Sequence, residues 1–172
     1  HDENGETIEE KRVCPGMLSA AMKGTPELIN LLVSYGADVQ EKDLNGETLL
    51  HKAAESGNHE LIRFLISSGL DVNQHKDATS RNVISQGEAP LHYAVRAHQL
   101  LAARSLIELG AKVNALEYFI GSKHKWFNTP LDLLGKDESC ELFELLVSKG
   151  AVKACDMDEP DRLLKAAASA VL

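Results

Sequence analysis

The sequence of 172 residues contains few cysteines, few aromatic residues and no long apolar run. Its cysteines, Cys14, Cys140 and Cys155, are odd in number and far apart, with no C-x-x-C pair. This argues against a disulfide framework and a cysteine-rich zinc site, and it favours a reducing compartment. No apolar stretch approaches the roughly 18 residues of a membrane-spanning helix, and the polar first residues lack the apolar core of a signal peptide. We therefore expect a cytoplasmic protein that does not insert into membranes.

Positive charge is also scarce, because 18 lysines and arginines face 26 aspartates and glutamates, for a net charge of −8. Such a chain has no overall positive field to gather phosphates, so we expect no nucleic acid partner. Apolar residues make up 44% and charged residues 26%, as in ordinary soluble globular proteins. No Gly-rich phosphate loop, G-x-S-x-G elbow or complete His-Glu-x-x-His pattern is present, and we expect no cofactor, no metal site and no catalytic residues.

An internal repeat organises the chain. The block from Asp43 to Asn73 recurs in degenerate form 33 residues earlier, then 41 residues later, and once more after a further 40. The distance from the helix-opening position to the closing glycine stays at 20 residues in the last three copies. The extra residues therefore lie between the copies. The closing glycines are Gly36, Gly69, Gly110 and Gly150.

Each copy predicts two short helices. A threonine such as Thr48 or Thr129 suits the start of the first helix, and Pro90 and Pro130 suit its first turn. Apolar residues at helical spacing follow in the second helix, and the glycine then provides a left-handed C-cap. Since one helix pair cannot bury both apolar faces, neighbouring pairs should stack into a continuous core.

The block Asp43–Asn73 resembles an ankyrin repeat almost position for position. The resemblance implies an all-α ankyrin-repeat solenoid of four repeats, with hairpin or loop fingers and a C-terminal capping helix. We place an N-terminal extension or degenerate cap at residues 1–15, the array at 16–152 and the capping helix at 156–172. The expected repeats span about residues 10–42, 43–83, 84–123 and 124–155.

The resemblance also gives two histidines a structural role. His51 and His92 occupy the histidine of the T-P-L-H pattern, where the imidazole ties adjacent loops through hydrogen bonds. Asp132 replaces this histidine in the fourth copy, and we expect a weaker tie there. Leu134-Gly135 replaces the small pair Ala53-Ala54 of the second copy, so we also expect different packing.

Arrays of this family bind proteins through the fingers and the inner faces of the first helices, which together form a concave groove. In this register the partner-binding candidates on the groove are Asn45, Glu47, Glu55, Glu88 and Arg96, with Leu44, Ser56, Ala97, Lys136 and Asp137 beside them. Any one of these positions could equally be only solvated.

Two insertions give the chain its individual character. We interpret the polar segment 74–86 as a flexible extended finger. The segment 115–128 holds Tyr118, Phe119, Trp126 and Phe127, half of the chain's aromatic residues, around a Gly-Ser turn, and this predicts a hairpin. Lys123 and Lys125 near its tip could orient an acidic segment of a partner.

Two arrangements fit the four rings. They could anchor a partner, because aromatic residues dominate interface hot spots, or they could fold back and bury one another. A mixed arrangement, with two rings as a pedestal and two facing outward, also fits. We expect a monomeric, non-catalytic adaptor, scaffold or targeting module that binds a protein partner. The alternatives are a regulatory or substrate-presenting segment of a larger enzyme, or a secreted effector.

Overall fold

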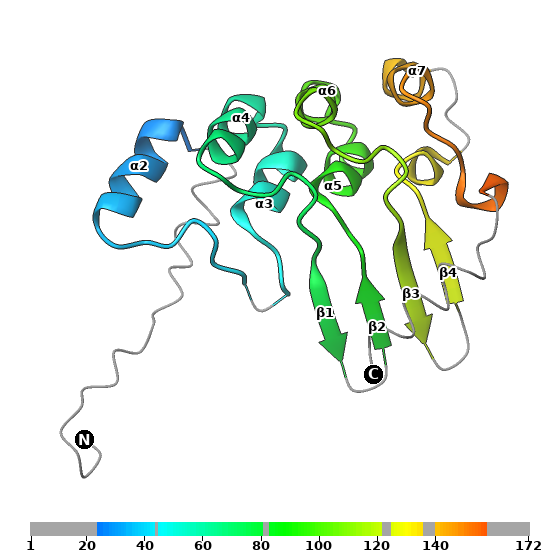
Figure 1. Ribbon diagram of the computed structural model, residues 1–172, viewed down its shortest axis with the longest axis horizontal. Coiled ribbons are helices and arrows are strands. Elements are labelled where there is room, and N and C mark those ends of the chain that lie inside the picture. Colours follow the sequence, from blue (N-terminus) through cyan, green and yellow to red (C-terminus); the bar gives the residue numbers. More distant parts are fainter. Residues whose placement is uncertain (1–23, 44, 81–82, 122–124, 136–139, 158–172) are drawn as a thin grey trace, which may run out of the picture.

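The computed structural model describes residues 24–43, 45–80, 83–121, 125–135 and 140–157. Within these residues, helices stand in two rows and a four-stranded sheet extends from the inner row (Figure 1). The elements are α2 (Pro26–Ser34), α3 (Leu49–Ser56), α4 (His59–Ser67), β1 (Asp77–Ser80), β2 (Val83–Gln86), α5 (Pro90–Arg96), α6 (Leu100–Glu108), β3 (Glu117–Gly121), β4 (Lys125–Asn128), the 3-10 helix η1 (Asp132–Leu134), α7 (Glu141–Ser148) and the 3-10 helix η2 (Ala154–Asp156).

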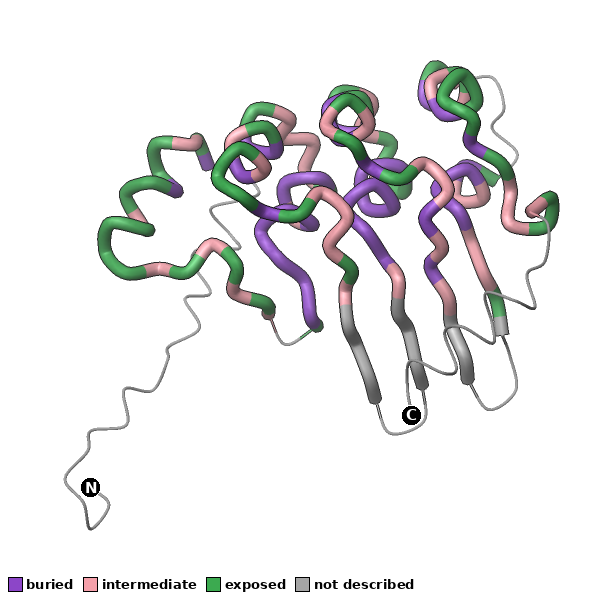
Figure 2. The backbone as a smooth tube through the Cα atoms, in the orientation of Figure 1, coloured by how far each residue is buried: buried purple, intermediate pink, exposed green. Residues whose placement is uncertain are grey.

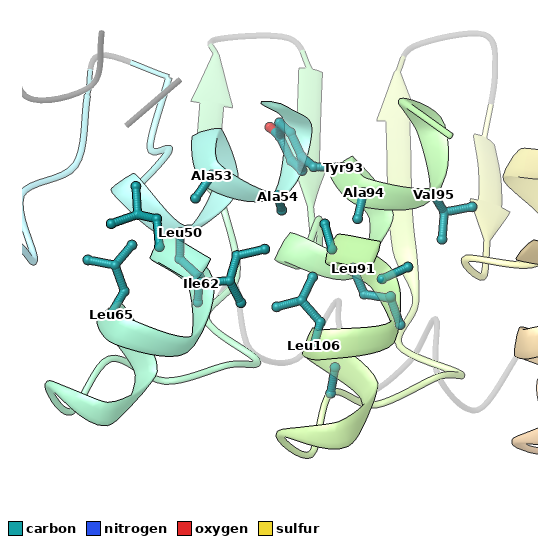
Figure 3. Packing of buried hydrophobic residues seen from close by; sticks show 14 of the residues in the cluster. Leu50, Ala53, Ala54, Ile62, Leu65, Leu91, Tyr93, Ala94, Val95 and Leu106 are labelled. Atoms are coloured by element: carbon teal, nitrogen blue, oxygen red, sulfur yellow. The ribbon is translucent and has the colours of Figure 1, made fainter. Parts of the chain in front are cut away.

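The expected stack of helix pairs is present. The inner helices α3 and α5 lie beneath the outer helices α4 and α6, and each pair packs against the next (Figure 1). Leu50 and Leu65 fill the space between α3 and α4, and Leu91 and Leu106 do the same between α5 and α6 (Figure 3). All four residues are buried, and so are Ala53, Ala54 and Ala94 between the inner helices. Figure 2 shows the inner helices α3 and α5 buried over most of their length. The core is thus continuous from pair to pair.

The local signals act where the sequence places them. The side chains of Thr48 and His51 form a capping box at the start of α3. The four predicted C-cap glycines all have a positive φ, between 81° and 98°, which confirms the left-handed turn after each outer helix.

The fingers form one antiparallel sheet in the order β1-β2-β3-β4. The hairpin predicted for residues 115–128 is confirmed as β3 and β4, with Phe119 opposite Trp126. The segment 74–86, interpreted as a flexible extended finger, is extended and forms the strands β1 and β2, a pairing that was not predicted. β2 also pairs with β3, so the inner strands of the two hairpins form backbone hydrogen bonds with each other.

The fourth copy departs from the others, as its Leu134-Gly135 sequence predicted. Instead of a helix over residues 130–135, a single 3-10 turn runs from Asp132 to Leu134 and ends at Gly135, whose φ is +61°. The outer helix α7 is nevertheless formed, and Leu142 and Leu146 are buried in the common core. The predictions of an N-terminal extension or cap, of a first helix in the first copy and of a capping helix fall on residues 1–23 and 158–172, which lie outside the described residues.

Candidate functional site

Two buried imidazoles join each finger to the next. His51 Nδ1 accepts hydrogen bonds from the backbone N–H of Thr48 at 3.2 Å and from its hydroxyl at 2.9 Å. Its Nε2 therefore carries the proton and donates to the carbonyl of Glu88 at 3.2 Å. His92 repeats this pattern, with Ala89 N–H on Nδ1 at 3.0 Å and the Ala115 carbonyl on Nε2 at 3.1 Å. Burial lowers the pKa of both histidines to about 4, so both rings are neutral at pH 7.

The expected weak tie at Asp132 was wrong. Asp132 Oδ2 accepts hydrogen bonds from the Thr129 N–H at 2.8 Å and the Thr129 hydroxyl at 3.0 Å, as the His51 imidazole does from Thr48, and the same hydroxyl lies 2.8 Å from the Val152 carbonyl oxygen. Asp132 Oδ2 also accepts from the N–H of Ala154 at 2.8 Å, which lies in the next loop. The loop-to-loop tie is kept because a carboxylate oxygen can accept several donors.

A row of ion pairs crosses the bases of the fingers, and we call it the charge ladder: Glu47, Lys52, Lys76, Glu88, Arg96 and Glu117. The Lys76 ammonium lies 3.3 Å from Glu47 and 3.1 Å from Glu88. Arg96 Nη2 then donates to Glu88 at 2.9 Å and to Glu117 at 2.7 Å. Three carboxylates from three successive fingers are thereby linked by cations placed between them.

Tyr93 stands at the centre of the ladder. Its hydroxyl donates to Glu47 Oε1 at 2.7 Å. The ring faces the Lys76 ammonium at 5.9 Å and the Arg96 guanidinium at 5.6 Å, both within the range of cation–π attraction. The His51 ring packs on the Tyr93 ring in an edge-to-face arrangement, with the ring centroids 5.1 Å apart. Tyr93 therefore joins the histidine ties to the charge ladder.

Burial and pairing act on the carboxylates in opposite directions. Burial alone would raise the pKa of Glu47, but hydrogen bonds from Lys52 and Tyr93 outweigh it and lower that pKa to about 2. In Glu88, burial is likewise outweighed, here by Lys76 and Arg96, and its pKa is lowered. Burial prevails in Glu117, whose side chain is only 1% exposed, and raises its pKa despite bonds from Asn128 and Arg96. Glu117 thus depends most on its partners to hold a charge.

A small pocket opens beside the ladder, at the ends of α3 and α5. It has a volume of about 180 Å³ and is lined by Glu55, Tyr93, Arg96 and Ala97. Three of these positions, Glu55, Arg96 and Ala97, are groove positions that the sequence singled out. The side chains of Glu55 and Arg96 are each 45% exposed, so opposite charges meet solvent here.

The finger residues divide between the two faces of the sheet. Asn128 donates to Glu117 at 3.0 Å, which places it on the side of the charge ladder. Since alternate residues of a strand share a face, Trp126 lies on that same side, where it is 40% exposed. Tyr118 and Phe127 are a cross-strand pair on the opposite face, where both are half-buried and their ring centroids lie 6.3 Å apart. We call the face that carries the ladder, the pocket and Trp126 the ladder face.

The structure brings five of the groove candidates, Glu47, Glu55, Glu88, Arg96 and Ala97, to the ladder face, but two of them are not at the surface. Glu47 and Glu88, expected on the groove surface, are buried, with 6% and 9% exposure, and serve as rungs of the ladder. Asn45 and Arg96 are exposed. Leu44, Lys123, Lys136 and Asp137 lie outside the described residues, and so do the side chains of Phe119 and Lys125.

Sequence reasoning missed four members of this arrangement: Lys52, Lys76, Tyr93 and Glu117. The sequence held one signal for the charge ladder. The residue directly before the helix-opening Thr or Ala is polar in three successive copies: Glu47, Glu88 and Asn128. A polar residue recurring beside a buried helix start predicts a polar partner. The insertions, which hold Lys76 and Glu117, have no counterpart in the repeat register and so could not be matched by spacing.

A family model for ankyrin repeats, in three copies, matches residues 17–117. The chain belongs to the ankyrin-repeat family. No curated protein matches it. Ankyrin repeats are generally protein–protein interaction modules. The ankyrin match ends at Glu117, the first residue of β3, so the rest of β3 and the elements β4, η1 and α7 lie beyond the matched residues.

Neither a metal cluster nor a membrane span is found in the described part of the chain. No three His, Cys, Asp or Glu side chains there are grouped to hold a metal ion. No described helix is long and apolar enough to cross a bilayer.

Proposed function

We propose that this ankyrin array is a non-catalytic binding module that holds a protein partner against the ladder face. The observation that carries the proposal is the position of Trp126. This large ring is 40% exposed and lies on the same face of β4 as Asn128, which donates a hydrogen bond to Glu117 of the charge ladder. A partner on the inner helices would therefore also meet an aromatic side chain on the fingers.

The aromatic residues on the two faces of the sheet have different roles in this proposal. Tyr118 and Phe127 pack on each other behind the sheet, which suits the pedestal of the mixed arrangement. Trp126 then supplies the anchor, since truncating a central aromatic residue at an interface costs about 2 kcal/mol or more. A rigid support favours binding because less conformational freedom is lost on association. The sheet and the ladder provide such a support.

The proposed role is that of a monomeric adaptor, scaffold or targeting module. Hydrogen-bonded ties run from the second copy to the third, from the third to the fourth and from the fourth to the loop that follows it, which supports a fold held together within one chain. The exposed surface beside the ladder is polar and charged, which suits an interface that forms and separates.

Affinity capture tests the proposal. The wild-type chain, Trp126→Ala and Leu101→Ala are immobilised separately and exposed to the same cell lysate. Leu101 is the matched control, because it is 57% exposed but lies on the outer helix α6. We expect proteins captured by the wild type to be retained by Leu101→Ala and lost by Trp126→Ala.

Folding must be checked in each variant by circular dichroism and urea unfolding. If folded Trp126→Ala captures the same proteins in the same amounts, the ladder face is not the binding surface. If Leu101→Ala loses the captured proteins instead, binding would be assigned to the outer helices.

A further inference from the structure

The pocket between α3 and α5 is a candidate for a partner side chain. Its volume of about 180 Å³ exceeds that of one water molecule many times over, and it opens between two half-exposed charged groups. Tyr93 and Ala97 add apolar surface to its wall. A side chain with an apolar stem and a polar end would match this lining.

The two charges at the pocket are compensated unequally. Arg96 already donates to Glu88 and Glu117 at 2.9 and 2.7 Å, so two carboxylates neutralise it. Among the described residues, the ion pair of Glu55 is with the Lys52 ammonium at 3.5 Å, and Lys52 also pairs more closely with the buried Glu47. The carboxylate of Glu55 is therefore the least compensated charge at the pocket.

The surrounding charges also favour a positively charged side chain in the pocket. Together, the ladder and the pocket hold three cations, Lys52, Lys76 and Arg96. These face four carboxylates, Glu47, Glu55, Glu88 and Glu117. The whole chain adds to this excess with its net charge of −8. A carboxylate entering to reach Arg96 would meet Glu88 and Glu117 at close range, whereas a cation would be attracted.

We infer that the pocket receives a lysine or arginine side chain from an extended basic segment of the protein partner. Its aliphatic stem packs on Tyr93 and Ala97, and its charged end pairs with Glu55. The inference rests on the proposed binding function and adds the chemistry of the partner. It gives this segment the opposite charge to the acidic one that the fingertip lysines suggested.

Peptides from a random display library, selected on the whole chain, are the probe. We expect the selected sequences to be enriched in lysine or arginine. Replacing the critical lysine by norleucine removes the charge and keeps the stem. A double-mutant cycle with Glu55→Gln should then show a coupling of about fivefold in affinity, and the coupling should shrink at high salt. Glu60→Gln removes the same charge from α4 and is the matched control, with no coupling expected.

The outcomes separate this inference from the proposed function. Selection of acidic peptides that depend on Arg96, or basic peptides with no coupling to Glu55, would overturn the inference. If those peptides still lose binding with Trp126→Ala, the proposed function stands. If no selected peptide responds to either Trp126→Ala or Glu55→Gln, both proposals are contradicted.

Discussion

The hydroxyl of Tyr93 donates a 2.7 Å hydrogen bond to Glu47, which lies 46 residues earlier in the chain. This contact joins the inner helix of one repeat to the finger of the repeat before it. Two such repeats cannot shift past each other without breaking it. The bond therefore contributes to holding the ladder face in one shape.

Replacing Tyr93 by phenylalanine tests this contact. The variant keeps the ring but removes a donor from a buried carboxylate, and we expect unfolding free energy to fall by about 1.5–3 kcal/mol. Urea unfolding measures the change. Tyr35→Phe, at the 84% exposed C-cap position of α2, should change stability by less than about 0.5 kcal/mol. Equal effects of the two substitutions would contradict the role of the bond.

The buried histidines predict a loss of stability in weak acid. Burial lowers the pKa of His51 and His92 from 6.5 to about 4, so the unfolded chain binds protons first as the pH falls. The stability they contribute is present above pH 6.5 and is lost as the pH falls toward 4. By about pH 5 each histidine should account for a loss of roughly 2 kcal/mol.

Urea unfolding at a series of pH values measures this loss, and NMR titration of the imidazole protons gives the two folded-state pKa values directly. A free energy of unfolding that stays constant between neutral pH and about pH 5, or imidazoles that titrate at the value of free histidine, would contradict the account.

The ion pairs of Arg96 and Arg63 predict that Arg96→Ala lowers the free energy of unfolding more than Arg63→Ala. Arg96→Ala leaves Glu117, which is 1% exposed, without its cation, and we expect a loss of about 2–3 kcal/mol, reduced from the full cost of a buried pair because Arg96 is half-exposed. The control Arg63→Ala breaks the exposed pair with Glu108 and should cost less than about 1 kcal/mol.

A second substitution separates lost charge from lost packing. Glu117→Gln in the Arg96→Ala background removes the unpaired carboxylate and should restore part of the lost stability. No restoration would indicate that Arg96 acts through packing alone.

Gly87 lies where the segment after β2 closely approaches the segment before β3. Its φ is +88°, and a Cβ built there would lie 2.2 Å from the backbone oxygen of Leu116. Gly87→Ala should therefore cost about 3 kcal/mol or more, because both the backbone and the clash oppose it. Gly110→Ala has a similar φ of +98° with open space around it, and should cost only about 1–2 kcal/mol. Thermal unfolding of the two variants compares them, and equal losses would place the fingers farther apart than described.

The sequence predicted the parts of this protein that depend on local signals. The closing glycines, the Thr48 helix start and the second hairpin follow from residues a few positions apart, and each is found. The sheet was only half predicted, because the pairing of β2 with β3 joins insertions that share no repeat register. The charge ladder was missed for the same reason, since Lys76 meets Glu47 and Glu88 only after the stack has formed. The carboxylate tie of Asp132 was misjudged because one oxygen serves three donors, which spacing does not reveal.

The most direct test of the proposed function is the affinity of Trp126→Ala for the partner identified by capture. Isothermal titration would compare it with the wild type and with Phe127→Ala, which alters the opposite face of the same strand. We predict that folded Trp126→Ala binds at least about thirtyfold more weakly. Phe127→Ala should lose stability while its folded fraction binds within a few-fold of the wild type. Unchanged affinity in folded Trp126→Ala would contradict binding through the ladder face.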